Sequence, residues 1–506
     1  MEKFSSNKRI AYNTIMLYIR MVFLLGVSFY TTRAILQTLG VVDLGIYNVV
    51  GGVVTMFSFI SGSLSTASSR FITYSLGQGN IEELKNTFNS IVSVHFILGL
   101  LILLLAETIG FWFVLNKLVI PSDRMVSAVW VYQSSVFSAF LVVLSTPFNS
   151  IIIAHERMSA FAYISIYEVL TKLFIVVLLS FIESDKLITY SLLLVLVQIS
   201  VILIYINYCR KHFLESRFKM SWSFFRMKKI FSYTGWVMTG SFAFICCTQG
   251  LNILLNLFFG PAVNAARALA NQLQGAVDRF TSNFQTAVTP QITISYAQGN
   301  IERMHTLVLA SSKFGALLML LLSVPIIIVT DFILDLWLGY VPNHTVEFVR
   351  IMLFVGIISA MKNPTMAAIH ATGRIKKIEI VEMFSLLSIV PISYIMLYSF
   401  RATAESVMSA YLLVEFYTQL LRVWIVYPEV GMKRVMFFTH VLYPVVVSCV
   451  VSIGISFLIK DFFSASFFNS LLSVIFSGLT TILVIFILGL SRYERKYLLS
   501  KLKRNS

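Results

Sequence analysis

The sequence predicts an all-α polytopic membrane protein with about 14 transmembrane helices. Two observations predict this fold. Of the 506 residues, 58% are hydrophobic and only 12% are charged, about half the charged fraction of roughly 25% in soluble domains. The apolar runs are also continuous, as at residues 97–106, whereas strands of a membrane β-barrel alternate apolar and polar residues. A soluble fold is therefore excluded, and helices are favoured over a barrel.

Each predicted helix is a stretch of about 20 mostly apolar residues, the length that crosses a bilayer. In chain order the fourteen stretches cover residues 11–34, 44–72, 88–114, 124–150, 159–182, 187–208, 230–259, 262–292, 305–330, 346–370, 378–400, 404–427, 435–459 and 467–490.

The basic residues between the spans predict the orientation of the chain. With the N-terminus placed in the cytoplasm, the cytoplasmic segments hold 24 Lys and Arg residues and the opposite loops hold 5. Because cytoplasmic loops of membrane proteins carry the excess of Lys and Arg, both termini are predicted to be cytoplasmic. Most of the net charge of +16 then reflects topology and does not indicate nucleic-acid binding.

An internal repeat divides the spans into blocks of six. The sequence QGNIE occurs at residues 78–82 and again at 298–302, each time in the loop after the second span of a block. Pro147 and Arg157 match Pro364 and Arg374 in the same way. Because six is an even number, both blocks have the same orientation, which predicts two lobes in parallel repeat. In each QGNIE segment we expect a glycine turn and an Asn-capped helix start, the alternative being a gating contact.

The repeat predicts three parts of the chain. An N-lobe at residues 1–229 holds spans 1–6 and a basic cytoplasmic linker, and a C-lobe at 230–430 holds spans 7–12. Residues 431–506 add two further C-terminal helices, spans 13 and 14, and a basic cytoplasmic tail.

Polar and cationic residues gather in the first two spans of each block. Residues 267, 271, 274 and 278 follow a spacing of 4, 3 and 4, so they share one face of a helix. A charge at the bilayer centre costs about 2.5–3.5 kcal/mol, so such a face lines a watery cavity or forms internal ion pairs. Four further cations lie near the ends of spans, and we expect their long side chains to reach the lipid headgroups. These are Lys172, Arg350, Lys362 and Arg422.

These residues form the candidate site. Arginine outnumbers the carboxylates in it, and its fork of donors suits phosphate or pyrophosphate. A buried carboxylate in the same face is a candidate for binding a coupling proton or cation. The candidate substrate-binding cations are Arg20, Arg33, Arg70, Arg267 and Arg279; the polar cavity lining is Gln249, Asn252, Asn256, Asn271 and Gln274; the ion-coupling candidate is Asp278.

Nothing in the sequence indicates an enzyme. The four cysteines show no paired spacing, the seven histidines are scattered, and no phosphate-binding loop of the G-x-x-x-x-G-K-[ST] type occurs. We therefore expect no catalytic residue, no metal and no cofactor, and a transporter rather than an enzyme.

Several segments carry a family resemblance: TRAIL at 32–36, LG at 39–40 and DLGIY at 43–47, RF at 70–71, AHERM at 154–158 and ATGR at 371–374. With these motifs and its repeat, the chain resembles the polysaccharide transporters, the Wzx-type O-antigen or lipid-linked oligosaccharide flippases, of the multidrug/oligosaccharidyl-lipid/polysaccharide (MOP) exporter superfamily. The resemblance implies that the chain moves an undecaprenyl-pyrophosphate-linked oligosaccharide across a bacterial inner membrane by alternating access, driven by an ion gradient. It implies lipid-linked oligosaccharide, membrane lipids and a coupling cation or proton as partners, and functional cations at Arg20, Arg33 and Arg267.

Two alternatives stay open. A multidrug or organic-cation antiporter of the same superfamily would normally have twelve spans and a cavity dominated by carboxylates. A membrane polysaccharide polymerase or ligase would usually show a large extracytoplasmic loop, which the predicted topology lacks.

Overall fold

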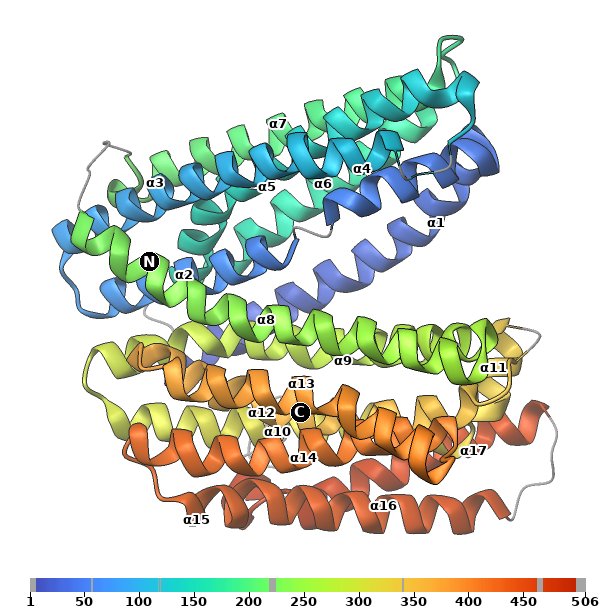
Figure 1. Ribbon diagram of the computed structural model, residues 1–506. Coiled ribbons are helices and arrows are strands. Elements are labelled where there is room, and N and C mark those ends of the chain that lie inside the picture. Colours follow the sequence, from blue (N-terminus) through green and yellow to red (C-terminus); the bar gives the residue numbers. More distant parts are fainter. Residues whose placement is uncertain are drawn as a thin grey trace. The chain divides into compact units, whose positions relative to one another are not determined.

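The computed structural model describes residues 6–55, 58–116, 118, 120–217, 224–338, 341–461 and 467–496. All regular elements in these ranges are helices (Figure 1), which confirms the all-α fold. The chain forms two compact units, Met1–Ser241 (unit 1) and Phe242–Ser506 (unit 2). The boundary between them falls inside the long helix α8 (Phe224–Phe259).

Unit 1 is built around α5, which packs against α2, α3 and α7, while α1 packs against α6. At its centre, the buried Tyr132 hydroxyl donates to the Ala106 carbonyl at 2.6 Å, where α3 passes into a π-helical turn. The elements of unit 1 are α1 (Ser6–Thr55), α2 (Ser58–Gly77), α3 (Ile81–Leu105), η1 (Ala106–Gly110), α4 (Phe111–Asn116), η2 (Ser122–Arg124), α5 (Met125–Ala154), α6 (Met158–Leu179), α7 (Lys186–His212), η3 (Leu214–Ser216) and the start of α8.

Unit 2 is built around α12, which packs against α9, α10 and α14. The last two long helices, α16 and α17, pack against each other and against α10. The elements of unit 2 are the rest of α8, α9 (Pro261–Ala297), α10 (Ile301–Ile328), α11 (Thr330–Leu338), α12 (Thr345–Thr372), α13 (Lys376–Phe400), α14 (Ala404–Glu429), α15 (Arg434–Phe437), η4 (Phe438–Leu442), α16 (Tyr443–Asp461), α17 (Phe467–Val484) and η5 (Ile485–Gly489).

The predicted spans correspond to the helices with two differences, one of which is α11, at Thr330–Leu338 in a predicted loop. The helix α1 continues through residues 35–43, where the sequence predicts a loop, and predicted span 2 is divided between α1 and α2. Among the described residues, ten helices are long and apolar enough to cross a membrane by length and composition. The other four predicted spans lie on α2, α9, α12 and α14. All four of these helices contain charged residues well inside their length, and α2, which contains Arg70, is also rich in serine and threonine.

The repeated QGNIE segments adopt the predicted cap. Gly79 and Gly299 both have φ of 74°, a conformation that glycine reaches without steric strain. The Asn80 side chain accepts a hydrogen bond from the Glu83 amide at 3.0 Å, and Asn300 accepts one from the Arg303 amide at 3.1 Å. These caps satisfy amides at the starts of α3 and α10 that would otherwise lack a partner.

A charged cluster in unit 1 ties the starts of α5 and α7 to α1. Arg124 Nε donates to Asp43 Oδ1 at 2.9 Å, and Nη1 donates to Asp185 Oδ2 at 2.8 Å. Asp185 also accepts a hydrogen bond from Ser127 Oγ at 2.8 Å, and it caps α7 by accepting from the amides of Leu187 and Ile188. One arginine thus fixes three helices at this end of unit 1.

Unit 2 has a pair at the starts of the corresponding helices. His344 directly precedes α12 and contacts Glu405 in the first turn of α14. The imidazole ring also stacks near Phe348, with ring centroids 6.1 Å apart. The two units therefore tie equivalent helix starts together through different residues, Arg124 in unit 1 and His344 in unit 2.

We expect Asp185→Ala to lower the unfolding free energy by about 1–2 kcal/mol, because it removes a helix cap as well as the ion pair. Asp185→Asn, which can still cap α7, should cost less. Burial opposes ionisation of Asp185, but the hydrogen bonds from Ser127, the Ile188 amide and Arg124 outweigh it and lower its pKa. The contribution of Asp185 to folding stability is therefore complete above the ordinary aspartate pKa of about 3.9. It is lost as the pH falls through the lowered pKa of the folded state. Unfolding midpoints of wild type and Asp185→Asn should converge in acid; a gap that widens there contradicts this account.

Candidate functional site

The predicted cation of unit 2, Arg267, lies between α8 and α9. These helices are joined at Gly260, whose φ of 83° reverses the chain before Pro261 opens α9. The Arg267 side chain is buried, with 4% of the residue exposed. Its Nη1 donates to the Thr248 carbonyl at 3.0 Å and to the Asn252 side-chain oxygen. The two chain segments therefore bring the polar residues of α8 onto the arginine of α9.

The partners of Arg267 are neutral. Asn252 in turn donates to Gln249 Oε1 at 3.2 Å, so three of the predicted site residues are connected. The buried Nε of Arg267 has no hydrogen-bond partner among the residues that the structure describes. Within the described part of the chain, no carboxylate lies within ion-pair distance of this guanidinium. A positive charge is thus held at the α8–α9 contact by oxygen acceptors that do not neutralise it.

The second half of the polar face of α9 packs against α12. Asp278 is half-buried and accepts a hydrogen bond from Gln274, one turn earlier. Both side chains lie next to Gly356 of α12, where a Cβ would stand 3.3 Å from Asp278 Oδ1 and 3.5 Å from Gln274 Nε2. Asp278 therefore occupies the packing between α9 and α12 and does not pair with Arg267. Of the other two candidates on α9, Asn271 is half-buried and Arg279 is exposed.

In unit 1, Arg20 lies between α1 and α6. Its guanidinium stands over the Phe161 ring, 4.4 Å from the centroid, an arrangement that favours a cation on an aromatic face. The neighbouring carboxylate Glu168 is bound by Lys172 at 2.6 Å, and the Nε of Arg20 has no hydrogen-bond partner. Like Arg267, this arginine has no carboxylate within ion-pair distance among the residues whose placement is described.

Two predicted site residues cannot be placed. The side chains of Arg33 on α1 and Asn256 on α8 lie outside the part of the chain whose side chains the structure describes.

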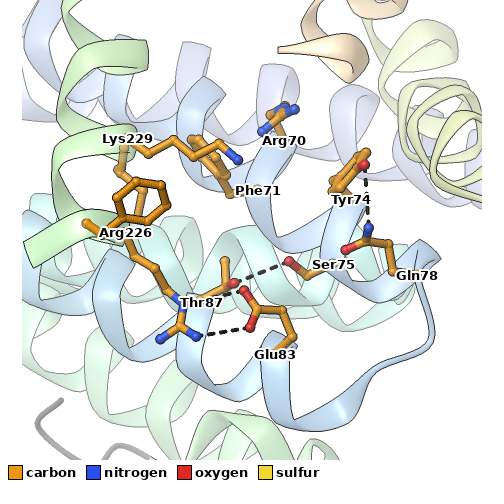
Figure 2. A pocket seen from close by; sticks show the side chains of 11 residues that line it. Arg70, Phe71, Tyr74, Ser75, Gln78, Glu83, Thr87, Arg226 and Lys229 are labelled. Carbon is orange, nitrogen blue, oxygen red and sulfur yellow. Dashed lines mark hydrogen bonds and ion pairs between the residues drawn. The ribbon is translucent and has the colours of Figure 1, made fainter. Parts of the chain in front are cut away.

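Arg70 belongs to a separate pocket at the end of unit 1 that carries the first QGNIE segment (Figure 2). The pocket has a volume of about 430 Å³ and lies among the end of α2, the start of α3 and the start of α8. Arg70 is held at its wall, with its guanidinium 4.6 Å, 5.0 Å and 5.5 Å from the ring centroids of Phe71, Tyr74 and Tyr233. The lining residues are Arg70, Phe71, Tyr74, Ser75, Gln78, Glu83, Thr87, Phe225, Arg226, Lys229 and Ile230.

Two further cations of this pocket come from α8. Arg226 Nη2 lies 3.1 Å from Glu83 Oε2 on α3, and Lys229 lines the pocket one turn further along α8 (Figure 2). In the sequence these residues count only as basic residues of the cytoplasmic linker. Their convergence with Arg70 depends on the packing of α8 against α2, two elements that are far apart in the chain.

A buried ion network in unit 2 was also not predicted. Arg422 of α14 is 0% exposed, and its Nη2 lies 3.0 Å from Glu382 Oε2 and 3.0 Å from Glu415 Oε1. Lys362 of α12 lies 3.1 Å from the same Glu382 oxygen. The expectation that Arg422 and Lys362 reach the headgroups is therefore wrong, because both pair with carboxylates of neighbouring helices. Lys172 and Arg350 are paired as well, with Glu168 at 2.6 Å and Asp331 at 3.1 Å.

The fold is that of known membrane transporters. A MATE protein in the bent conformation has a TM-score of 0.73 and 14% identity, with 87% of this chain and 100% of that chain covered. An outward-facing multidrug resistance MATE family transporter of the MOP superfamily has a TM-score of 0.71 and 15% identity, covering 85% and 97%. A MOP superfamily transporter from Pyrococcus furiosus Vc1 has a TM-score of 0.70 and 14% identity, with 85% of this chain and 99% of that chain covered. Its binding pocket of reverse polarity is described as suggesting a different function.

No family model and no curated protein matches the chain. The structural likeness and the apolar helices define an integral multi-pass membrane protein. More narrowly, the chain has the fold shared by MATE transporters of the MOP superfamily. This agrees with the predicted resemblance at the level of the fold, and the similar structures are described as MATE or MOP transporters.

Proposed function

We propose that this chain is an exporter that carries a lipid-linked oligosaccharide with an anionic phosphate or pyrophosphate link across the membrane. The observation that supports the proposal best is the state of Arg267. The residue is buried, and among the described residues its Nε has no hydrogen-bond partner and its Nη1 contacts neutral acceptors. In unit 1, the half-buried Arg20 stands over an aromatic ring, and its Nε has no hydrogen-bond partner among the described residues. Arg20 lies on one of the ten helices that are apolar enough to cross a membrane, and Arg267 lies on α9, a predicted span outside these ten.

The energetics favour an anionic substrate. Burial of an unneutralised guanidinium is unfavourable, because neutral oxygens replace only part of its hydration. An anion that binds these donors recovers this free energy, and a fork of N–H groups matches the oxygens of a phosphate. A cationic drug would add a second positive charge beside the first. The positions of Arg20 and Arg267 therefore each suit a phosphate group of the substrate. The polyprenyl chain of the substrate would remain in lipid.

The rest of the proposal follows the sequence resemblance. Transport would proceed by alternating access, with an ion gradient as the energy source, in a bacterial inner membrane with both termini in the cytoplasm. Asp278 remains the candidate for the coupling ion, since it is a half-buried carboxylate without a cationic partner among its described contacts. The parts of the chain would be the N-lobe, the C-lobe and the C-terminal addition that the repeat predicts.

The test is a transport assay with the purified full chain in vesicles. A polyprenyl-pyrophosphate oligosaccharide is placed in one leaflet, and a membrane-impermeant glycosidase measures its arrival in the other. We expect the chain to accelerate its movement at least tenfold, and not to move the same glycolipid without the pyrophosphate. Deletion in the native host should cause the lipid-linked oligosaccharide to collect on the cytoplasmic leaflet. Equal movement of both glycolipids, or none, would refute the proposal.

A multidrug antiporter is the second candidate, and the structural similarity to MATE transporters favours it. For that function the vesicles should accumulate an organic cation against an imposed proton or sodium gradient. Drug sensitivity with normal polysaccharide in the deletion strain would select this candidate. Oligosaccharide that crosses normally but remains unpolymerised would instead indicate a polymerase or ligase.

A further inference from the structure

We propose that the pocket of unit 1 in Figure 2 binds the phosphate group of an anionic membrane lipid. This site is separate from the Arg20 and Arg267 positions, and the inference does not depend on which substrate the protein carries. The ligand class is a glycerophospholipid with a net negative headgroup.

The charge of the pocket supports an anionic ligand. Its lining contains three cations, Arg70, Arg226 and Lys229, and one carboxylate, Glu83. Glu83 is engaged by Arg226, at 3.1 Å from Nη2 and 3.4 Å from Nε. The lining therefore has a net charge of +2, and its one carboxylate is already paired with Arg226.

The rigidity of Arg70 supports a formed site rather than a diffuse basic surface. Only 8% of this residue is exposed, and three aromatic rings surround its guanidinium. A donor that is already held in place loses little conformational freedom when it binds a ligand. Lys229 lines the pocket and is exposed, so its ammonium group can reach an anion that binds there.

The apolar rim supports a lipid over a soluble anion. Phe225 lines the pocket and is 80% exposed, and the preceding Phe224 is 82% exposed. From here α8 continues as an apolar helix long enough to cross a membrane. Aromatic rings beside Lys and Arg at the end of a span are typical of the headgroup layer of a bilayer. A lipid phosphate in the pocket would leave its acyl chains beside these rings.

The chain offers a matched pair of substitutions. Lys229→Gln removes a cation of the pocket, and Lys228→Gln removes the same charge from the adjacent exposed residue, which does not line it. A surface cation contributes about 1 kcal/mol to the binding of an anionic lipid, or about fivefold in affinity. Arg226→Gln provides a second pocket variant, although it also leaves Glu83 without its partner.

The experiment measures lipid binding to the purified full chain in detergent, by native mass spectrometry with phosphatidylglycerol and with phosphatidylcholine. We expect preferential binding of phosphatidylglycerol, weakened about fivefold by Lys229→Gln and unchanged by Lys228→Gln. Equal weakening by both variants would mean a diffuse surface charge and overturn the site. Displacement of the lipid by millimolar inorganic phosphate would mean a soluble-anion site and overturn the lipid assignment. Because transport is not measured, failure here and failure of the proposed substrate are separate results.

Discussion

Replacement of Arg422 by alanine is expected to destabilise the protein by about 3–5 kcal/mol, the range for breaking a buried ion pair on one side. The substitution leaves Glu382 and Glu415 buried, with Lys362 as the remaining cation near Glu382. It also removes the largest fully buried side chain of the described residues. The loss has two physical causes, an uncompensated negative charge and a cavity.

The measurement is unfolding of the purified protein in mixed micelles by titration with a denaturing detergent. Arg374→Ala is the matched control, since Arg374 is 79% exposed and lies 3.8 Å from Glu429. A surface arginine of this kind should change stability by less than about 0.5 kcal/mol. If the Arg422 variant unfolds at the same detergent concentration as this control, the network does not stabilise unit 2 in the way its geometry indicates.

Arg267→Gln is expected to reduce transport of the anionic glycolipid at least tenfold while leaving the fold intact. Glutamine removes the positive charge and keeps a polar amide side chain at this position, although the amide is too short to replace Nη1 as the donor to Thr248 and Asn252. Because Arg267 is buried and no described carboxylate pairs with it, its removal should leave thermal stability unchanged or raise it. A variant that is as stable as wild type and inactive would separate a role in function from a role in folding.

The assay is the vesicle experiment with pyrophosphate-linked glycolipid, at equal amounts of folded protein. Lys377→Gln removes the same charge from a residue that is 78% exposed in the same unit, and it should transport normally. A second comparison is Arg267→Lys, which keeps the charge but not the fork of donors and should retain part of the activity. Full transport by Arg267→Gln would exclude this arginine from substrate binding.

The difference between the two buried arginines explains why one is expected to act in stability and the other in function. Arg422 has two carboxylates within hydrogen-bond distance, so its charge is balanced inside unit 2. Arg267 has a backbone carbonyl and an amide oxygen, so its charge is not balanced. A protein retains an unbalanced buried charge at a cost in stability, and such positions are typical of binding sites.

The amino-acid sequence alone predicts the all-α membrane fold, because a bilayer admits only long apolar helices where no barrel alternation is present. It also predicts the capped turns at Asn80 and Asn300, since glycine and asparagine determine these turns through local backbone chemistry. It predicts which helices are polar, because the spacing of polar residues along a helix is a property of the chain itself. It does not predict that α1 continues through residues 35–43, which lie between the first two predicted spans.

The partners of the charges depend on packing between distant segments. Glu382 and Arg422 are on different helices, as are Arg70 and Lys229, and no local pattern encodes which faces meet. In the sequence, Arg267 lies on a polar helical face and Arg422 lies near the end of a predicted span, and neither position reveals the partner of the arginine. Only the packed helices show that Arg422 pairs with carboxylates and that Arg267 contacts neutral oxygens. Whether an ion pair forms depends on the distance between side chains of neighbouring helices.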